Sequence, residues 1–148
     1  MKRVLVCGCR WLGDRKSILE SHQYSEVNLL FAIHRKFFYD TCDTILTEWG
    51  ITNPTVISGG ANGADTLAIE WGEDRGYVVE KYPALWRVEG TYNPKAGIER
   101  NAIMVDRADQ VIAFWDYVSR GTKDSILRTE QSGKPLHIVD IRRFKLNL

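Results

Sequence analysis

The chain has 148 residues, of which 44% are hydrophobic and 26% are charged, a composition typical of one soluble globular domain spanning 1–148. The formal net charge of +1 gives no basic field that would attract nucleic acid, so nucleic acid is not an expected partner. No apolar run is long enough to span a membrane and no signal sequence follows Met1, so we expect a cytoplasmic protein without membrane contact.

Strands are expected to alternate with helices along the chain. The apolar run 3–7 predicts the first strand, and apolar positions between Ser25 and Trp49 recur at near-helical spacing up to Gly50, a natural helix stop. The remaining pattern predicts strands at 55–58, 77–82, 110–115 and 136–141, and helices at about 64–75, 98–108 and 122–132. Five strands with intervening helices predict a three-layer α/β fold, a parallel sheet with helices on both faces.

The segment 55–65 combines a β-branched strand, three glycines and an acid that leads into a helix. Gly59, Gly60 and Gly63 let backbone N–H groups approach a ligand, and the helix start adds unpaired donors and the positive end of its dipole. This combination is typical of a phosphate-binding turn. Close packing of the strand on the helix requires the same glycines, so the segment by itself leaves both interpretations open.

Four segments are expected at one edge of the sheet, because ligands in such folds bind beyond the carboxyl ends of the strands. They are residues 8–14, 58–65, the end of a long connection at 97–101, and 116–122. Glycine backbones, arginine forks and hydroxyl groups in these segments are donors that phosphate prefers. The predicted ligand-binding residues are Gly8, Arg10, Ser58, Gly59, Gly60, Gly63, Asp65, Arg100, Asn101, Arg120, Gly121 and Thr122.

These motifs resemble the SLOG superfamily, the Rossmann-like fold of the Lonely Guy phosphoribohydrolases, the DNA-processing protein DprA and the YpsA proteins, and most of all its small YspA-type branch. The branch has G-S-R-x-W-x-D after the first strand, which 8–14 follows in order, and G-G-A-x-G-A-D, which 59–65 matches fully. Further matches are P-A-x-W at 83–86, I-R-N at 98–101, A-D-x-V-I-A-F at 108–114 and G-T at 121–122. The resemblance implies a nucleotide-related ligand and homo-oligomers.

Two departures from the related proteins bear on function. Related proteins have P-G-G-x-G-T before the last helix, and residues 117–122 of this chain lack two of those glycines. The guanidinium of Arg120 can replace the backbone N–H donors that those glycines would present. Where the Lonely Guy enzymes place a catalytic glutamate, this chain has Ser125, and Asp124 is out of register by about 100° on a helix. The catalytic residue is therefore unknown, with Asp65, Glu99 and Asp124 as weak candidates.

Two function classes follow. The first and favoured one is binding or sensing of a nucleotide or nucleotide-derived ligand, such as an NAD fragment or ADP-ribose, at the edge of the sheet. The second is a hydrolase or transferase that cleaves an N-glycosidic bond of a nucleoside monophosphate or an NAD-like substrate. A weaker alternative is binding of single-stranded DNA, by analogy with DprA. Whether the protein is an enzyme stays open.

The remaining residues indicate no cofactor and no metal. Cys7, Cys9 and Cys42 lack metal-ligand spacing and are expected to be reduced thiols. The aromatic side chains of the first long helix, Phe31, Phe37, Phe38 and Trp49, exceed what one side of a small sheet needs. Together with the resemblance, they predict a homodimer or a higher homo-oligomer.

Overall fold

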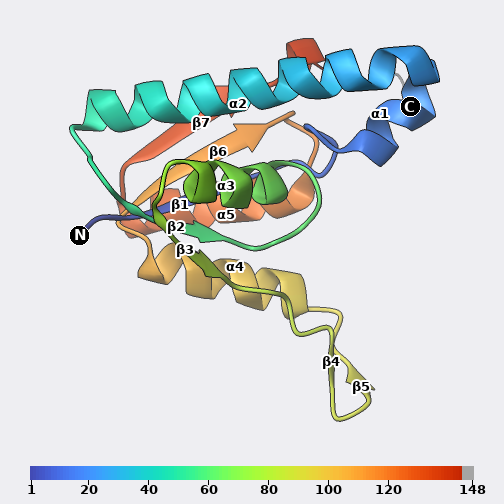
Figure 1. Ribbon diagram of the computed structural model, residues 1–148. Coiled ribbons are helices and arrows are strands. Elements are labelled where there is room, and N and C mark those ends of the chain that lie inside the picture. Colours follow the sequence, from blue (N-terminus) through green and yellow to red (C-terminus); the bar gives the residue numbers. More distant parts are fainter. Residues whose placement is uncertain (145–148) are drawn as a thin grey trace.

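The computed structural model describes residues 1–144 and contains a five-stranded parallel sheet between two layers of helices (Figure 1). The strand order is β3-β2-β1-β6-β7, and all four pairings are parallel. The three-layer α/β fold predicted from the sequence is confirmed. The strands are β1 (Arg3–Gly8), β2 (Thr55–Ser58), β3 (Val78–Lys81), β6 (Gln110–Trp115) and β7 (Leu136–Asp140).

Five α-helices connect the strands and cover both faces of the sheet. They are α1 (Arg15–Ser21), α2 (Val27–Trp49), α3 (Ala64–Asp74), α4 (Ala96–Arg107) and α5 (Arg120–Ser132), with 3-10 turns at Tyr24–Glu26 and Arg142–Phe144. Val4 and Val6 of β1 face α2 and α3, whereas Leu5 and Cys7 face α4 and α5, because successive strand residues point to opposite faces. Within residues 1–144, no helix has the length and apolar character of a membrane span.

One helix and one two-stranded hairpin were not predicted. Helix α1 buries only Ile18, so it carries no apolar period, although Asp14 caps it by accepting the N–H of Ser17 at 3.2 Å. The strands β4 (Arg87–Val88) and β5 (Thr91–Tyr92) form a hairpin that extends beyond the start of α4 (Figure 1). Its turn places Glu89 and Gly90 at positive φ, 51° and 78°, the geometry of the tightest hairpins.

Some helix bounds differ from the prediction by about one half turn. Helix α4 begins at Ala96 rather than at 98, because the side-chain oxygen of Asn93 accepts the N–H of Lys95 and its carbonyl accepts the N–H of Ala96. Gly97 therefore lies in the first turn instead of preceding it. Helix α5 begins at Arg120 rather than at 122, and α2 begins at Val27 after a 3-10 turn that contains Ser25.

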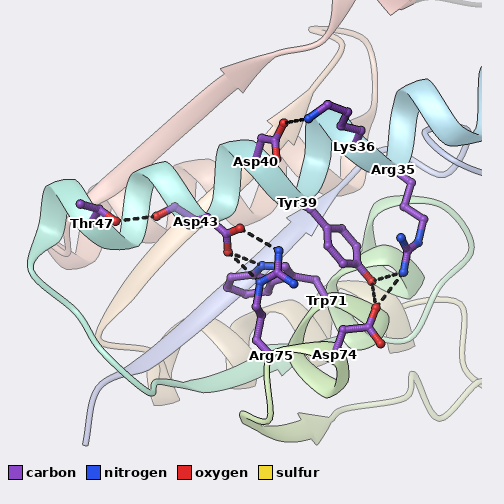
Figure 2. A network of polar contacts seen from close by, with 9 residues as sticks. All are labelled: Arg35, Lys36, Tyr39, Asp40, Asp43, Thr47, Trp71, Asp74 and Arg75. Atoms are coloured by element: carbon purple, nitrogen blue, oxygen red, sulfur yellow. Dashed lines mark hydrogen bonds and ion pairs between the residues drawn. The ribbon is translucent and has the colours of Figure 1, made fainter.

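Two carboxylates join α2 to α3 (Figure 2). Asp43 accepts the indole N–H of the fully buried Trp71 at 2.9 Å and a two-pronged contact from Arg75, with Nη2 at 2.8 Å. Asp74 accepts the hydroxyl of Tyr39 at 2.5 Å and Nη2 of Arg35 at 2.7 Å. These contacts fix the position of α3, whose first turn carries Asp65.

Replacing Asp43 with alanine is expected to lower the free energy of unfolding by about 1–3 kcal/mol, since the buried indole N–H of Trp71 loses its acceptor. Asp40→Ala is the control on the same helix: Asp40 pairs with Lys36 at 2.7 Å between two exposed side chains, a contact worth about 0–1 kcal/mol. Urea unfolding of both variants measures the difference. Equal losses would contradict the role given to Asp43.

Candidate functional site

A cavity of about 470 Å³ opens at the carboxyl ends of β1 and β6. We call it the rim cavity. It is bounded by the segment after β1, by the turn before α3, by one side of α4 and by the first turn of α5. Eight of the predicted ligand-binding residues line it, namely Gly8, Arg10, Asp65, Arg100, Asn101, Arg120, Gly121 and Thr122.

The other four predicted residues, Ser58, Gly59, Gly60 and Gly63, are not among the residues that line the cavity. The hydroxyl of Ser58 donates to the carbonyl of Asp65 at 2.8 Å and accepts the N–H of Gly60 at 3.3 Å, which holds the turn closed. The glycine turn itself reaches the cavity through Ala61.

Gly59 and Gly63 both lie close to other parts of the chain, Gly59 to side chains and Gly63 to backbone. A Cβ on Gly59 would lie 2.6 Å from Nη1 of Arg100, and one on Gly63 would lie 2.4 Å from the carbonyl carbon of Arg10. At Gly60, in contrast, a Cβ would meet nothing within 4 Å, and only its φ of +73° favours glycine. Of the two interpretations of this segment, close packing of backbone on backbone therefore accounts for Gly63, whereas Gly59 approaches the side chains of Arg100 and Asp65. Gly60 is exposed but is not among the residues that line the rim cavity.

Arg100 is fixed against the glycine turn. Its Nη1 donates to the carbonyl of Gly59 at 2.8 Å and to that of Tyr82 at 3.4 Å, and its Nε donates to the side-chain oxygen of Asn101 at 3.3 Å. Its Nη2 has no protein partner among the residues described here. The guanidinium is thus held in place while one of its nitrogens stays available to a ligand.

Asp65 is the one acidic side chain among the cavity-lining residues that the structure describes. Burial raises the pKa of this carboxyl to about 6, against the opposing effects of the Ala61 N–H and of two arginines. Those arginines are Arg100 and Arg10. Because about half of this carboxyl is protonated near pH 6, it opposes an anionic ligand less there than an ordinary aspartate would.

The free energy of unfolding should depend on pH through the carboxyl of Asp65. Its pKa is higher in the folded chain than in the unfolded one, so its contribution is complete below about pH 4 and is lost as the pH rises through about 6. We expect Asp65→Asn to gain on the order of 2–3 kcal/mol of unfolding free energy relative to the parent between pH 4 and pH 7. Urea unfolding of both proteins across this range measures the gain; a constant difference would contradict it.

The first turn of α5 is directed at the cavity by Asp116. This carboxylate accepts the N–H of Ser119 at 2.7 Å, its hydroxyl at 3.0 Å and the indole N–H of Trp11 at 2.9 Å. Burial acts to raise the pKa of Asp116, but these hydrogen bonds outweigh it and hold the pKa below its ordinary value. The hydroxyl of the N-cap Ser119 donates to Asp116 and makes no cap hydrogen bond. The first turn of α5 therefore presents uncapped backbone N–H groups at the cavity.

Arg10, Arg100 and Arg120 give the cavity its positive charge. Arg10 and Arg120 are exposed and line it from the segments 8–14 and 116–122, and in residues 1–144 neither is in an ion pair with a carboxylate. Two unpaired arginines beside an uncapped helix start form a site suited to an anion.

The other catalytic candidates lie outside the rim cavity. Asp124 accepts Nε of Arg128 at 2.9 Å and the side-chain amide of Asn101 at 3.2 Å, and it is the buried Ser125 that lines the cavity. Glu99 lies at a different cavity and accepts the side-chain amide of Asn93 at 2.9 Å.

Two of the three cysteines, Cys7 and Cys9, line the rim cavity. Burial raises the pKa of Cys9 to about 12 and that of Cys7 further, so both cavity-lining thiols stay protonated at neutral pH. All three cysteines are buried and free. Across the described part of the chain, no three His, Cys, Asp or Glu side chains gather as metal ligands would.

The hydrogen bond from Trp11 to Asp116, which joins the segment after β1 to the start of α5, was not predicted. Both residues lie in predicted segments, 8–14 and 116–122, but a hydrogen bond between residues so far apart in the chain leaves no local signal in the sequence. Trp11 lines the cavity, and its indole N–H donates to Asp116 and is not free for a ligand. Ser17 from the unpredicted helix α1 also lines the cavity, although it lies outside the four predicted segments.

Comparison with known proteins identifies the family. Residues 2–88 match the YspA, cpYpsA-related SLOG family. The chain belongs to this family. The matched part of this SLOG protein includes both glycine motifs, at 8–14 and 59–65, and the resemblance predicted from them is confirmed. The chain is also 30% identical over 142 residues to the Gene 61 protein of Mycobacterium phage D29, across 92% of this chain and 94% of the phage protein.

Two solved structures share the fold of this SLOG protein. A crystal structure of the protein TM1055 superposes with a TM-score of 0.58 at 20% identity, over 92% of this chain and 72% of that one. DNA processing protein A from Helicobacter pylori, described with its single-stranded DNA binding mode, superposes with a TM-score of 0.55 at 17% identity. This match covers 93% of this chain and 64% of the Helicobacter protein.

Proposed function

We propose that this SLOG protein binds or senses a nucleotide or a nucleotide-derived ligand, such as an NAD fragment or ADP-ribose, and holds its phosphate in the rim cavity. The observation that carries the proposal is the pairing of Arg10 and Arg120, neither in an ion pair within residues 1–144, with the uncapped start of α5. Family membership supports it, since nucleotide-related ligands are common in SLOG proteins.

A hydrolase that acts on an N-glycosidic bond is the second candidate, and Asp65 is the residue that favours it. A carboxyl with a pKa of about 6 inside a cavity is suited to proton transfer near neutral pH. Ser125 stands where the Lonely Guy enzymes have their glutamate, and the carboxylate of Asp124 accepts a hydrogen bond from Arg128 outside the cavity. Asp65 would therefore have to act without a second carboxylate among the described cavity-lining residues. We therefore place binding ahead of turnover.

Single-stranded DNA is a third candidate ligand, suggested by the fold shared with the Helicobacter protein. A short oligonucleotide offers the same phosphate and base chemistry as a mononucleotide. It belongs in the ligand screen for this reason.

The test is a thermal-shift screen with mononucleotides, NAD, ADP-ribose and an oligothymidylate, followed by calorimetry on the best ligand and analysis of products. Arg120→Ala should weaken binding by about 1.5–3 kcal/mol, the cost of a hydrogen bond to a charged group, or about tenfold to hundredfold in affinity. Lys123→Ala is the control, because Lys123 is an exposed cation in the same helix turn outside the cavity. Equal effects of the two changes would contradict the site.

A further inference from the structure

A second cavity, of about 280 Å³, lies beside Arg100, between the connection that follows β3 and helix α4. Tyr82, Pro83 and Leu85 form one wall, and Ala96 and Ile103 of α4 form the other. Among the described residues, Arg100 is the one that lines both this cavity and the rim cavity. We propose that the second cavity binds the base of the nucleotide whose phosphate lies in the rim cavity, and we call it the base cavity.

The walls of the base cavity suit a flat apolar group. Leu85 is 65% exposed and Ile103 is 47% exposed, and the two side chains face a hollow that the protein itself leaves unfilled. A heterocycle between them would remove apolar surface from water, which is the main source of affinity in such sites. The proposal rests on the proposed function, because it places a second part of the same ligand.

Glu99 selects among bases. Its Oε2 accepts the side-chain amide of Asn93 at 2.9 Å, and its Oε1 has no protein partner within residues 1–144. A carboxylate oxygen of this kind accepts an N–H and repels a carbonyl oxygen. The cavity is therefore suited to a base that carries an exocyclic amino group, such as adenine.

Arg100 connects the two cavities. Its Nη1 is bound to the carbonyl of Gly59 in the glycine turn and to that of Tyr82 in the base cavity wall, so the guanidinium stands between the two sites in a fixed position. Its remaining nitrogen, Nη2, has no partner in the described chain and faces a ligand that passes over it. If the phosphate lies in the rim cavity and the base in the base cavity, the sugar between them lies at Arg100. The two cavities together therefore suit a nucleotide better than a free phosphate or a free base.

The experiment compares adenosine 5′-monophosphate with ribose 5-phosphate, which has the same phosphate and sugar but no base. Calorimetry should give the nucleotide an advantage of about tenfold or more in the parent protein. Ile103→Trp fills the base cavity and should bring the two affinities to within about twofold of each other. Leu127→Trp is the control: Leu127 is also 47% exposed, lies on α5 outside both cavities, and should leave the advantage intact.

Inosine 5′-monophosphate tests Glu99, because a carbonyl replaces the amino group of adenine. The parent protein should bind it several-fold more weakly than adenosine 5′-monophosphate, and Glu99→Gln, whose amide can donate to that carbonyl, should reduce the preference. Equal binding of the nucleotide and ribose 5-phosphate, or an advantage that survives Ile103→Trp, would overturn the base cavity and leave the phosphate site standing. Binding of neither compound would overturn the base cavity as an adenine site, and failure of every ligand in the thermal-shift screen would overturn the proposed function as well.

Discussion

Gly63→Ala is expected to lower the free energy of unfolding by about 3 kcal/mol or more, because it combines backbone strain with overlap against backbone atoms. Gly63 has φ +83° and ψ −129°, a conformation that side chains other than glycine rarely adopt. Its Cβ would lie 2.5 Å from the carbonyl oxygens of both Cys9 and Arg10. Neither oxygen can withdraw without moving the segment after β1, so the change should also deform the rim cavity.

Gly60→Ala is the matched control for this prediction. Gly60 also has a positive φ, +73°, but its Cβ would meet nothing within 4 Å, so the expected loss is only about 1 kcal/mol. Denaturant unfolding of the two variants separates the effect of overlap from that of φ. Similar losses in both would mean that the approach of the glycine turn to Cys9 and Arg10 is looser than the structure describes.

The sheet could be predicted because its central strands are buried on both faces. Buried strands carry continuous apolar runs, and the predicted bounds of β2 and β6 agree with the structure while β1 gains only Gly8. The missed elements are those whose side chains stay in water. The β4–β5 hairpin exposes Val88 and Tyr92, and α1 buries a single residue, so neither leaves a periodic pattern.

The candidate site could be located from the sequence but not resolved into roles. The pattern of glycines cannot distinguish a backbone that approaches a ligand from one that approaches its own chain. Gly8 illustrates the second case, since its Cβ would lie 2.6 Å from the carbonyl oxygen of Phe114. The cavity arises where the segment after β1 meets the start of α5, and Asp116 makes this junction through a hydrogen bond from Trp11.

Three of the four aromatic residues named on α2 pack against the core of the chain itself. Phe38 is fully buried and stacks on Phe114 with ring centroids 4.3 Å apart, and Phe37 and Trp49 pack against the same core. Phe31 lies under the guanidinium of Arg15, 4.0 Å from its ring centroid. The homo-oligomer stays a prediction; the fully buried Phe38 offers it no surface, whereas Phe31, Phe37 and Trp49 are only partly buried.

Arg100→Ala is expected to weaken nucleotide binding by about 1.5–3 kcal/mol, or about tenfold to hundredfold, since the ligand loses a charge-assisted hydrogen bond. The sequence predicts Arg100 as a ligand-binding residue. The structure gives it a second role, because Nη1 binds the carbonyls of Gly59 and Tyr82. We therefore also expect a loss of about 1–3 kcal/mol in the free energy of unfolding.

Arg107→Ala separates the two roles from a general effect of charge. Arg107 belongs to the same helix but is exposed and donates to the hydroxyl of Tyr82 at 3.0 Å, away from the rim cavity, so its removal should change affinity less than about twofold. Calorimetry at a temperature where all three proteins are fully folded keeps stability out of the binding measurement.

Because Arg100 lowers the pKa of Asp65, the pKa of this carboxyl in the Arg100→Ala variant should lie above about 6. An affinity within about twofold of the parent, together with reduced stability, would make Arg100 a support of the glycine turn alone and would remove the connection between the two cavities.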